Sequence, residues 1–174
     1  MSLPKLFITD IDGVWTDGGM YYDQTGNEFK KFNTSDSAGV LFLNYLEIPL
    51  AIITSENTQI VERRAQKLNI NHLYQGVKDK VGTAQEICKI VGVQMNEVAF
   101  IGDDLNDIPL LKKVGFPGVP ANAPDYVKKY SKYDLKTSGG DGAFREFVET
   151  ILIQNDKLNH VLEVHLKRVS EQSK

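Results

Sequence analysis

The sequence predicts an α/β fold, a Rossmann-like, mostly parallel sheet flanked by helices. Short apolar runs alternate along the chain with segments whose apolar residues recur at helical spacing. Each run leads directly into polar residues, which is typical of buried strands in a parallel sheet. The repeated order of strand and helix favours right-handed crossovers into a single sheet.

Six short segments are predicted to form the strands of this sheet. Three of them are almost continuously apolar, which indicates burial on both faces. The other three are short. The predicted strands cover residues 6–9, 50–54, 72–74, 98–101, 116–119 and 133–135.

Apolar residues three and four positions apart predict the helices that connect the strands. A helix over residues 81–91, for example, would align Val81, Ala84, Ile87, Cys88 and Val91. The predicted helices cover residues 38–46, 58–68, 81–91, 106–114 and 142–153.

Residues 20–32 depart from this alternation and predict a β-hairpin with aromatic faces. Two short strands are joined there by a turn that contains Gly26-Asn27. The hairpin interrupts the first connection from strand to helix, at the edge where open α/β sheets bind ligands. A hairpin that only fills the edge of the sheet is the alternative.

The C-terminal segment differs in pattern, so we divide the chain into a domain over 1–154 and an amphipathic tail over 155–174. One helical stripe of the tail carries Leu158, Val161, Leu162, His165, Leu166 and Val169. Such a stripe packs either on the same chain or on a second subunit. The pattern alone leaves both open.

Composition excludes several classes of protein. The chain has 174 residues, 41% hydrophobic and 25% charged, with a formal net charge of −3. These values favour one packed domain over a disordered chain. No apolar run approaches the roughly 20 residues of a membrane span. We expect no membrane partner, and no nucleic-acid partner either, because phosphate backbones need a basic protein face.

The sequence also favours a cytoplasmic location. Cys88 is the single cysteine and cannot form a disulfide within the chain. The N-terminal segment has a short apolar run but no small-residue cleavage site, so we expect no signal peptide. Both features fit a reducing compartment.

Carboxylates follow two of the predicted strands. Asp10 and Asp12 lie two positions apart after the first run, so strand alternation would direct both into one pocket. Close carboxylates require a cation between them or a retained proton. Asp103, Asp104 and Asp107 follow the run 98–101, and oxygen ligands from two strand ends suit Mg²⁺. Aspartates in ordinary turns are the alternative.

A hydroxyl and a lysine complete the candidate site. Thr54 and Ser55 precede a predicted helix, which would place them at a helix N-terminus that favours an anion. A plain helix cap is the alternative. Lys80 opens another predicted helix, where a cation is slightly unfavourable, so we interpret it as the counter-charge of a phosphate. A solvated surface lysine is the alternative.

The order of these groups resembles the four-part signature of the haloacid dehalogenase superfamily of phosphotransferases. The parts are Asp10-x-Asp12-Gly13, a hydroxyl at Thr54, Lys80, and 102–107 with its three aspartates. The resemblance spans roughly residues 3–153 and favours phosphate transfer over dehalogenation.

This resemblance implies a role for each group. Asp10 would be the nucleophile that accepts the phosphoryl group, and Asp12 the general acid and base. Thr54 and Lys80 would hold the phosphate. The Asp10 carboxylate, the Asp12 carbonyl and Asp103 would bind Mg²⁺. Asp104 and Asp107 would support Lys80 or metal-bound water.

The insertions are too short for the cap domain of larger superfamily members. The hairpin follows Gly13, and only 25 residues lie between Thr54 and Lys80. The chain resembles a capless branch of tetrameric sugar-acid phosphatases that act on 3-deoxy-D-manno-octulosonate 8-phosphate and its nine-carbon relatives. The similar segments are 12–18, the hairpin, 36–39, 75–80 and 139–146. This implies a homotetramer in which a neighbouring subunit covers the site.

The substrates of that branch carry a carboxylate as well as a phosphate. Arg63, Arg64 and Lys67 form a basic cluster on one predicted helix, although solvated charges explain such clusters equally well. Ser55-Glu56 stands where octulosonate phosphatases usually have Gly-Arg.

Glu56 with Lys67 is instead similar to the nine-carbon branch, which hydrolyses 2-keto-3-deoxynononate 9-phosphate or N-acylneuraminate 9-phosphate. We therefore expect a nine-carbon substrate bound by Ser55, Glu56, Arg64 and Lys67, with the eight-carbon substrate as the alternative. A further alternative is a non-catalytic oligomerisation module associated with a sugar-acid cytidylyltransferase. The presence of all five motif residues argues against a non-catalytic module, because assembly requires none of them. These residues are Asp10, Asp12, Thr54, Lys80 and Asp103.

Overall fold

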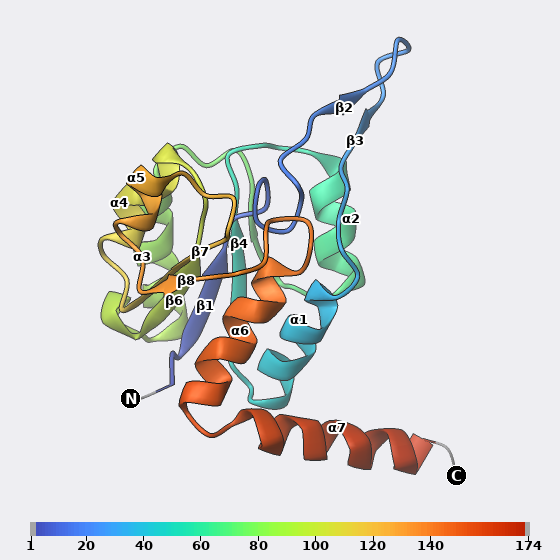
Figure 1. Cartoon of the computed structure of the whole chain (residues 1–174), viewed down its shortest axis with the longest axis vertical. Coiled ribbons are helices and arrows are strands. Elements are labelled where there is room, and N and C mark those ends of the chain that lie inside the picture. The colour runs from blue at the N-terminus through green and yellow to red at the C-terminus, as the bar shows by residue number, and fades with distance from the viewer. Residues whose placement is uncertain (1–2, 173–174) are drawn as a thin grey trace.

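A parallel sheet forms the centre of the protein and carries helices on both faces (Figure 1). The computed structural model describes residues 3–172. Within them, the central sheet consists of β1 (Leu6–Thr9), β4 (Leu50–Ile53), β5 (His72–Tyr74), β6 (Val98–Ile101), β7 (Phe116–Val119) and β8 (Tyr133–Asp134). The order across the sheet is β5-β4-β1-β6-β7-β8, and neighbouring strands are parallel. The predicted α/β fold is confirmed.

The helices of the described residues are α1 (Asp36–Tyr45), α2 (Gln59–Lys67), α3 (Lys80–Val91), α4 (Ile108–Leu111), α5 (Asp125–Lys128), α6 (Ala143–Gln154) and α7 (Leu158–Gln172). Short 3-10 turns lie at Met95–Glu97 and Leu105–Asp107. One hydrophobic cluster joins a face of the sheet to α1, α2, α6 and α7, and a second joins the other face to α3, α4 and α5. Figure 1 shows α1, α2 and α6 on the opposite side of β1 from α3, α4 and α5.

The central strand β1 contributes to both clusters. Phe7 belongs to the first cluster, whereas Leu6 and Ile8 belong to the second, as strand alternation requires. All three side chains are completely buried. Burial on both faces explains why this stretch of sequence is continuously apolar.

The observed bounds correct the predicted ones mainly in the helices. α1 begins earlier than predicted, at Asp36. The helix predicted over 106–114 is wrong in extent, because a 3-10 turn comes first and only Ile108–Leu111 is α-helical. The turn Met95–Glu97 and helix α5 were not predicted. Elements of three or four residues contain too few positions to show a hydrophobic period.

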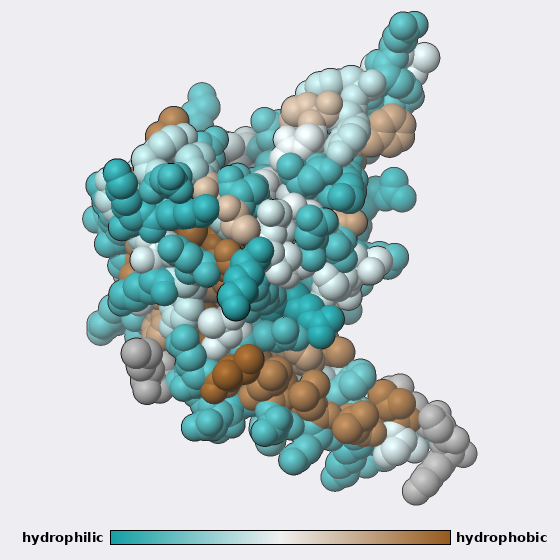
Figure 2. Space-filling view, viewed as in Figure 1, coloured by the Kyte–Doolittle hydropathy of each residue, from teal (hydrophilic) through white to brown (hydrophobic). Residues whose placement is uncertain are grey.

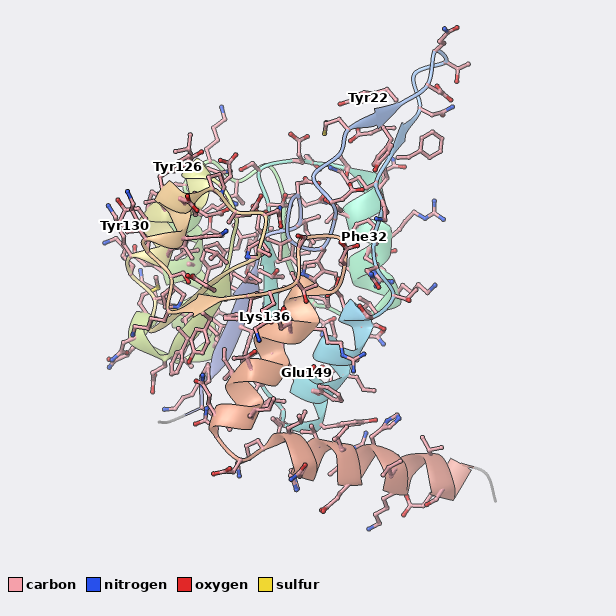
Figure 3. The ribbon with its side chains drawn as sticks, in the orientation of Figure 1. Tyr22, Phe32, Tyr126, Tyr130, Lys136 and Glu149 are labelled. Atoms are coloured by element: carbon pink, nitrogen blue, oxygen red, sulfur yellow. The ribbon has the colours of Figure 1, made fainter. Side chains whose placement is uncertain are left out.

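The predicted hairpin lies between β1 and α1 and consists of β2 (Tyr21–Tyr22) and β3 (Glu28–Phe29). It projects beyond the body of the protein, with Tyr22 on the projecting part (Figures 1 and 3). The aromatic side chains of both strands are exposed. An antiparallel backbone bridge between Thr16 and Phe32 holds the base of the hairpin against the loop after β1.

Helix α7 packs partly on the body of the same chain. Val161 is completely buried in the cluster that includes α1 and α6, and the Tyr45 hydroxyl lies 2.9 Å from His165 Nδ1. Leu162 and Leu166 are exposed, and Figure 2 shows hydrophobic residues gathered along α7. A separate tail beginning at residue 155 stays a prediction. None of the described helices is both long enough and apolar enough to span a membrane.

Candidate active site

The carboxyl ends of β1, β4 and β6 form the floor of an open pocket of about 240 Å³. Thr9 at the end of β1 is aligned with Ile52 on one side and with Ile101 on the other. The loops that follow these strands therefore emerge side by side at one edge of the sheet. Described residues that line the pocket are Asp10, Asp12, Gly13, Gly18, Thr54, Ser55, Glu56, Asp103, Asp104 and Asn106.

Asp10 is buried and held in place from two sides. Its Oδ1 accepts a hydrogen bond from the backbone N–H of Ile11 at 2.7 Å. Its Oδ2 accepts one from Lys80 Nζ at 2.6 Å. Burial, together with repulsion from Asp107, raises the pKa of Asp10 to about 7, against the opposing attraction of Lys80. One cation therefore does not fully compensate the charge of this carboxylate.

Lys80 lies between two carboxylates and is almost completely buried. Its Nζ is 2.6 Å from Asp10 Oδ2 and 2.6 Å from Asp107 Oδ1. Burial lowers the pKa of Lys80, but attraction to Asp10 and Asp107 more than offsets this and raises it above its ordinary value. Lys80 is the first residue of α3, as predicted. The alternative of a solvated surface lysine is wrong.

Asp107 holds Lys80 and also orders the loop after β6. Its Oδ2 accepts hydrogen bonds from the backbone N–H groups of Asp103 and Asp104, at 2.9 and 3.1 Å. Both of its oxygens are thus engaged. Among the described residues, by contrast, the buried Oδ1 of Asp103 has no hydrogen-bond partner. Asp103 therefore has a carboxylate oxygen that could bind a cation.

The carboxylates fit a divalent cation. Oxygens of Asp10, Asp103 and Asp107 all lie within 4.8 Å of one another. Burial and repulsion from Asp10 and Asp107 raise the pKa of Asp103 to about 8. Such crowding is unfavourable unless protons or a cation neutralise it. Hard carboxylate oxygens are the ligands that Mg²⁺ prefers.

Asp12 lines the same pocket, although not for the reason expected from strand alternation. β1 ends at Thr9, so both Asp10 and Asp12 lie in the loop beyond the strand. Asp12 Oδ1 is 2.6 Å from Nζ of Lys30, which follows β3 of the hairpin. Lys30 was not predicted as a site residue, because it lies 18 positions from Asp12 and their contact depends on how the hairpin folds back.

Thr54 lies in the candidate site as predicted, but the prediction that it lies at a helix N-terminus is wrong. Thr54 lines the pocket directly after β4, and its backbone N–H donates to Tyr74 O at 3.0 Å. It does not lie at a helix N-terminus, because α2 begins at Gln59. Thr58 is the N-cap, and its side chain accepts a hydrogen bond from Val61 N.

The residues predicted to bind substrate fall into two pockets. Ser55 and Glu56 line the pocket of the carboxylates, where Asn106 Nδ2 donates to Ser55 Oγ at 3.0 Å. Asn106 was not singled out from the sequence. Asp104 lines this pocket too, and its Oδ1 accepts a hydrogen bond from Leu105 N at 2.7 Å.

Arg63, Arg64 and Lys67 line another pocket with Phe32 and Ile60. Arg64 Nη2 donates to the backbone carbonyl of Asn33 at 3.1 Å, and the residue is partly buried. The basic cluster predicted on α2 therefore exists, but within one chain it does not join the carboxylate pocket.

The chain is similar in sequence and in fold to known proteins. A family model described as haloacid dehalogenase-like hydrolase matches residues 18–147. The chain belongs to this family. Its sheet and hairpin match a probable YrbI family phosphatase from Pseudomonas syringae, with a TM-score of 0.89 at 39% identity over 94% of this chain and 93% of that one.

Curated relatives share more than the fold. The 3-deoxy-D-manno-octulosonate 8-phosphate phosphatase of Yersinia pestis is 40% identical over 154 residues, which cover 88% of this chain and 82% of the relative. The protein of the same name from Escherichia coli K12 is 36% identical over 155 residues, which cover 89% and 82%. This chain is accordingly a phosphoric monoester hydrolase of the haloacid dehalogenase family.

The solved structure of a relative supports Mg²⁺ as the cation. The 3-deoxy-D-manno-octulosonate 8-phosphate phosphatase of Moraxella catarrhalis was solved with a magnesium ion, a phosphate ion and a KDO molecule. It matches this chain with a TM-score of 0.89 at 34% identity, over 93% of each chain. The relative's magnesium and the aspartate cluster of this chain agree on the cofactor.

Proposed function

We propose that this Mg²⁺-dependent phosphatase hydrolyses the phosphate ester of a 2-keto-3-deoxy sugar acid, with 3-deoxy-D-manno-octulosonate 8-phosphate as its substrate. The observation that carries the proposal is the contact between buried Asp10 and Lys80, next to the partly buried Asp103, at the carboxyl edge of the sheet. The relatives that bear this substrate in their names support the eight-carbon choice. The expectation of a nine-carbon substrate becomes the second candidate.

Asp10 is the nucleophile in this proposal. A carboxylate repels a phosphate dianion, so positive charge must first be brought to the reacting atoms. Lys80, held 2.6 Å from Asp10, supplies part of that charge, and the Thr54 hydroxyl donates to a phosphate oxygen. Asp10 then bonds to phosphorus as the bond to the sugar oxygen breaks. The aspartyl phosphate divides one difficult displacement into two easier ones.

Asp12 transfers the proton in both steps. Its carboxyl group donates a proton to the leaving sugar oxygen, and the resulting carboxylate accepts one from water, which attacks phosphorus and releases Asp10. Asp10, Asp103 and the Asp12 carbonyl would hold Mg²⁺. When bound, the ion would supply further positive charge against the phosphate oxygens. Asp107 keeps Lys80 in place and orders the loop that carries Asp103.

One observation favours the nine-carbon candidate. Glu56 lines the carboxylate pocket, where its side chain can accept hydrogen bonds from sugar hydroxyls. It would repel a substrate carboxylate, which must therefore bind elsewhere. We propose that Arg64 and Lys67 of a neighbouring subunit meet the carboxylate in a homotetramer, because within one chain they line a different pocket.

A substrate panel tests the proposal. Phosphate release is measured with Mg²⁺ on six-, eight- and nine-carbon phosphates, for wild type and Glu56→Arg. We expect the highest kcat/KM with the eight-carbon substrate, and a Glu56→Arg variant that favours it further over nine carbons. A higher kcat/KM for the nine-carbon substrate in wild type would support the second candidate. Inertness towards all of them would overturn the function.

A further inference from the structure

We propose that Lys30 is a positioning residue for Asp12, through which the base of the hairpin fixes the general acid and base of the reaction. The inference rests on the proposed function, because Asp12 has this role there. Lys30 Nζ is 2.6 Å from Asp12 Oδ1, and the Lys30 side chain is only 1% exposed. An ammonium group removed from water to this extent requires an anionic partner.

The hairpin directs Lys30 towards the pocket by simple alternation. Glu28 and Lys30 lie two positions apart and share one face of the extended chain, whereas Phe29 between them is exposed on the other. Glu28 Oε1 is 3.7 Å from Lys30 Nζ, on the same side. The bridge from Thr16 to Phe32 fixes the returning chain beside the loop that carries Asp12.

The contacts distinguish the two oxygens of Asp12. Oδ1 accepts hydrogen bonds from Lys30 Nζ at 2.6 Å and from Thr16 Oγ1 at 3.3 Å. Oδ2 is buried and has no hydrogen-bond partner within residues 3–172. Two donors on one oxygen fix the rotation of the carboxyl group. The other oxygen is thereby left for proton transfer with the leaving group and with water.

Neighbouring lysines provide a matched comparison. Lys31 is 57% exposed, and its closest carboxylate oxygens, on Asp17 and Asp141, are 3.9 and 3.8 Å away. Lys31→Met removes the same charge from the same strand end without touching Asp12. Lys30→Met removes the donor, whereas Lys30→Arg keeps a cationic donor and should recover part of the activity.

Substrates with different leaving groups distinguish a role of Lys30 in positioning Asp12 from a purely structural role of Lys30. A sugar alkoxide needs the proton of Asp12, whereas p-nitrophenolate leaves readily without it. With the sugar-acid phosphate, we expect Lys30→Met to lower kcat about 10²-fold, with KM changed less than about threefold. With p-nitrophenyl phosphate, Asp10 should still be phosphorylated rapidly, but Asp12 no longer assists attack by water. The variant should therefore release about one equivalent of p-nitrophenol in a burst before slow turnover.

Each outcome decides the matter. A burst in Lys30→Met, partial recovery in Lys30→Arg and near-normal rates in Lys31→Met would support the inference. Equal losses with both leaving groups and no burst would overturn it, as would a Lys30→Met variant as active as Lys31→Met. If Lys30→Met does not fold, as judged by its thermal transition, Lys30→Gln is put through the same burst experiment. A wild type inert towards every sugar phosphate would instead refute the proposed function.

Discussion

Three carboxylates share a small space in this protein, and Lys80 alone does not neutralise them. Asp107 has both oxygens engaged, whereas the Oδ1 of Asp103 has no hydrogen-bond partner in the described part of the chain. Burial is the first cause of the raised pKa values of Asp10 and Asp103, and repulsion from Asp107 adds to both. Repulsion from Asp10 raises the pKa of Asp103 further. The same repulsion makes the cluster attractive to a divalent cation.

Binding of Mg²⁺ should therefore release protons. The pKa values are about 7 for Asp10 and about 8 for Asp103 without the ion, and both groups must ionise to bind it. We expect release of at least about one proton at pH 7 and tighter binding as the pH rises from 6 to 8. Calorimetry in buffers of different ionisation enthalpy measures both. Asp103→Asn should weaken binding and reduce the release, and an affinity independent of pH would contradict the account.

Gly13 is required beside the cation site for two reasons. Its φ of +80° is left-handed, and an added Cβ would lie 1.9 Å from Asp103 Oδ2. Gly13→Ala should displace Asp103 and lower kcat/KM by about 10²-fold or more, measured by phosphate release. Gly92 is the matched control, because its φ is +78° with nothing within 4 Å of an added Cβ. Gly92→Ala should lose stability but keep its activity, so equal activity losses in the two variants would refute this role.

Three of the motif residues can be recognised in the sequence because each follows an apolar run. Asp10, Thr54 and Asp103 were predicted to share one site from their positions after strands and from the order of the motifs, and the structure brings them together in one pocket. Lys30 and Asn106 were not foreseen. Their contacts depend on the path of a hairpin and on the turn after β6, which a pattern of apolar residues does not specify.

At the scale of elements, α1 and α6 are joined by a buried acidic side chain. Asp36, in the first turn of α1, accepts a hydrogen bond on Oδ1 from the backbone N–H of Arg145 at 3.1 Å. It therefore caps α6, whose own N-cap residue, Gly142, has no side chain to do so. Burial raises the pKa of Asp36 to about 6, although the Arg145 hydrogen bond and Arg64 oppose the shift.

This cap predicts a defined dependence of stability on pH. Because the pKa is about 6 in the folded protein and 3.8 ordinarily, the folded state retains the proton longer. The contribution of Asp36 to stability is complete below pH 4 and is lost as the pH rises through 6. Asp36→Asn keeps the acceptor without the charge, so urea unfolding should find it at least as stable as wild type at pH 7.

The advantage of Asp36→Asn over wild type should disappear near pH 4, where both side chains are neutral. Asp36→Ala removes the acceptor and should cost about 1 kcal/mol at pH 4. The cost should be smaller at pH 7, where the ionised Asp36 of wild type has lost its contribution to stability. A difference between Asp36→Asn and wild type that stays constant from pH 4 to 7 would contradict the assigned pKa.

Strands were predicted more accurately than helix ends. β1, β4 and β6 are almost continuously apolar because they are buried on both faces, and β1, β5, β6 and β7 have the predicted bounds. Helix ends depend on capping contacts from distant residues, as the Asp36 cap on α6 illustrates. The start of α2 was placed next to Thr54 in the interpretation of the phosphate site, although Thr58 provides the actual cap.

At the scale of the whole molecule, the basic pocket on α2 is separate from the carboxylate pocket. If subunits share their sites as proposed, Asp10 of one chain works with Lys67 of another. Asp10→Asn and Lys67→Ala homo-oligomers should each be impaired, whereas mixed oligomers should regain up to about a quarter of wild-type activity, measured as phosphate release. Mixtures no more active than their components, or a monomer with full selectivity, would refute shared sites.

The sequence could not determine this arrangement of subunits, because the pattern of the tail fits packing on either chain. The structure shows Val161 of α7 buried on its own chain, with Leu162 and Leu166 exposed. The modest net charge was likewise a poor guide to ligands. An anionic substrate responds to the local positive charge of Lys80 and of the basic residues on α2. The net charge of −3 for the whole chain does not show this local charge.

The central claim is that Asp10 accepts the phosphoryl group. It is tested most directly by acid-quenching a single turnover of a sugar-acid phosphate that carries a radiolabelled phosphoryl group. We predict label on the peptide that contains Asp10 in wild type and in Asp125→Asn, a control at an exposed aspartate. Asp10→Asn should carry no label and release no phosphate. Labelled Asp10→Asn, or phosphate release from it at the wild-type rate, would contradict the account.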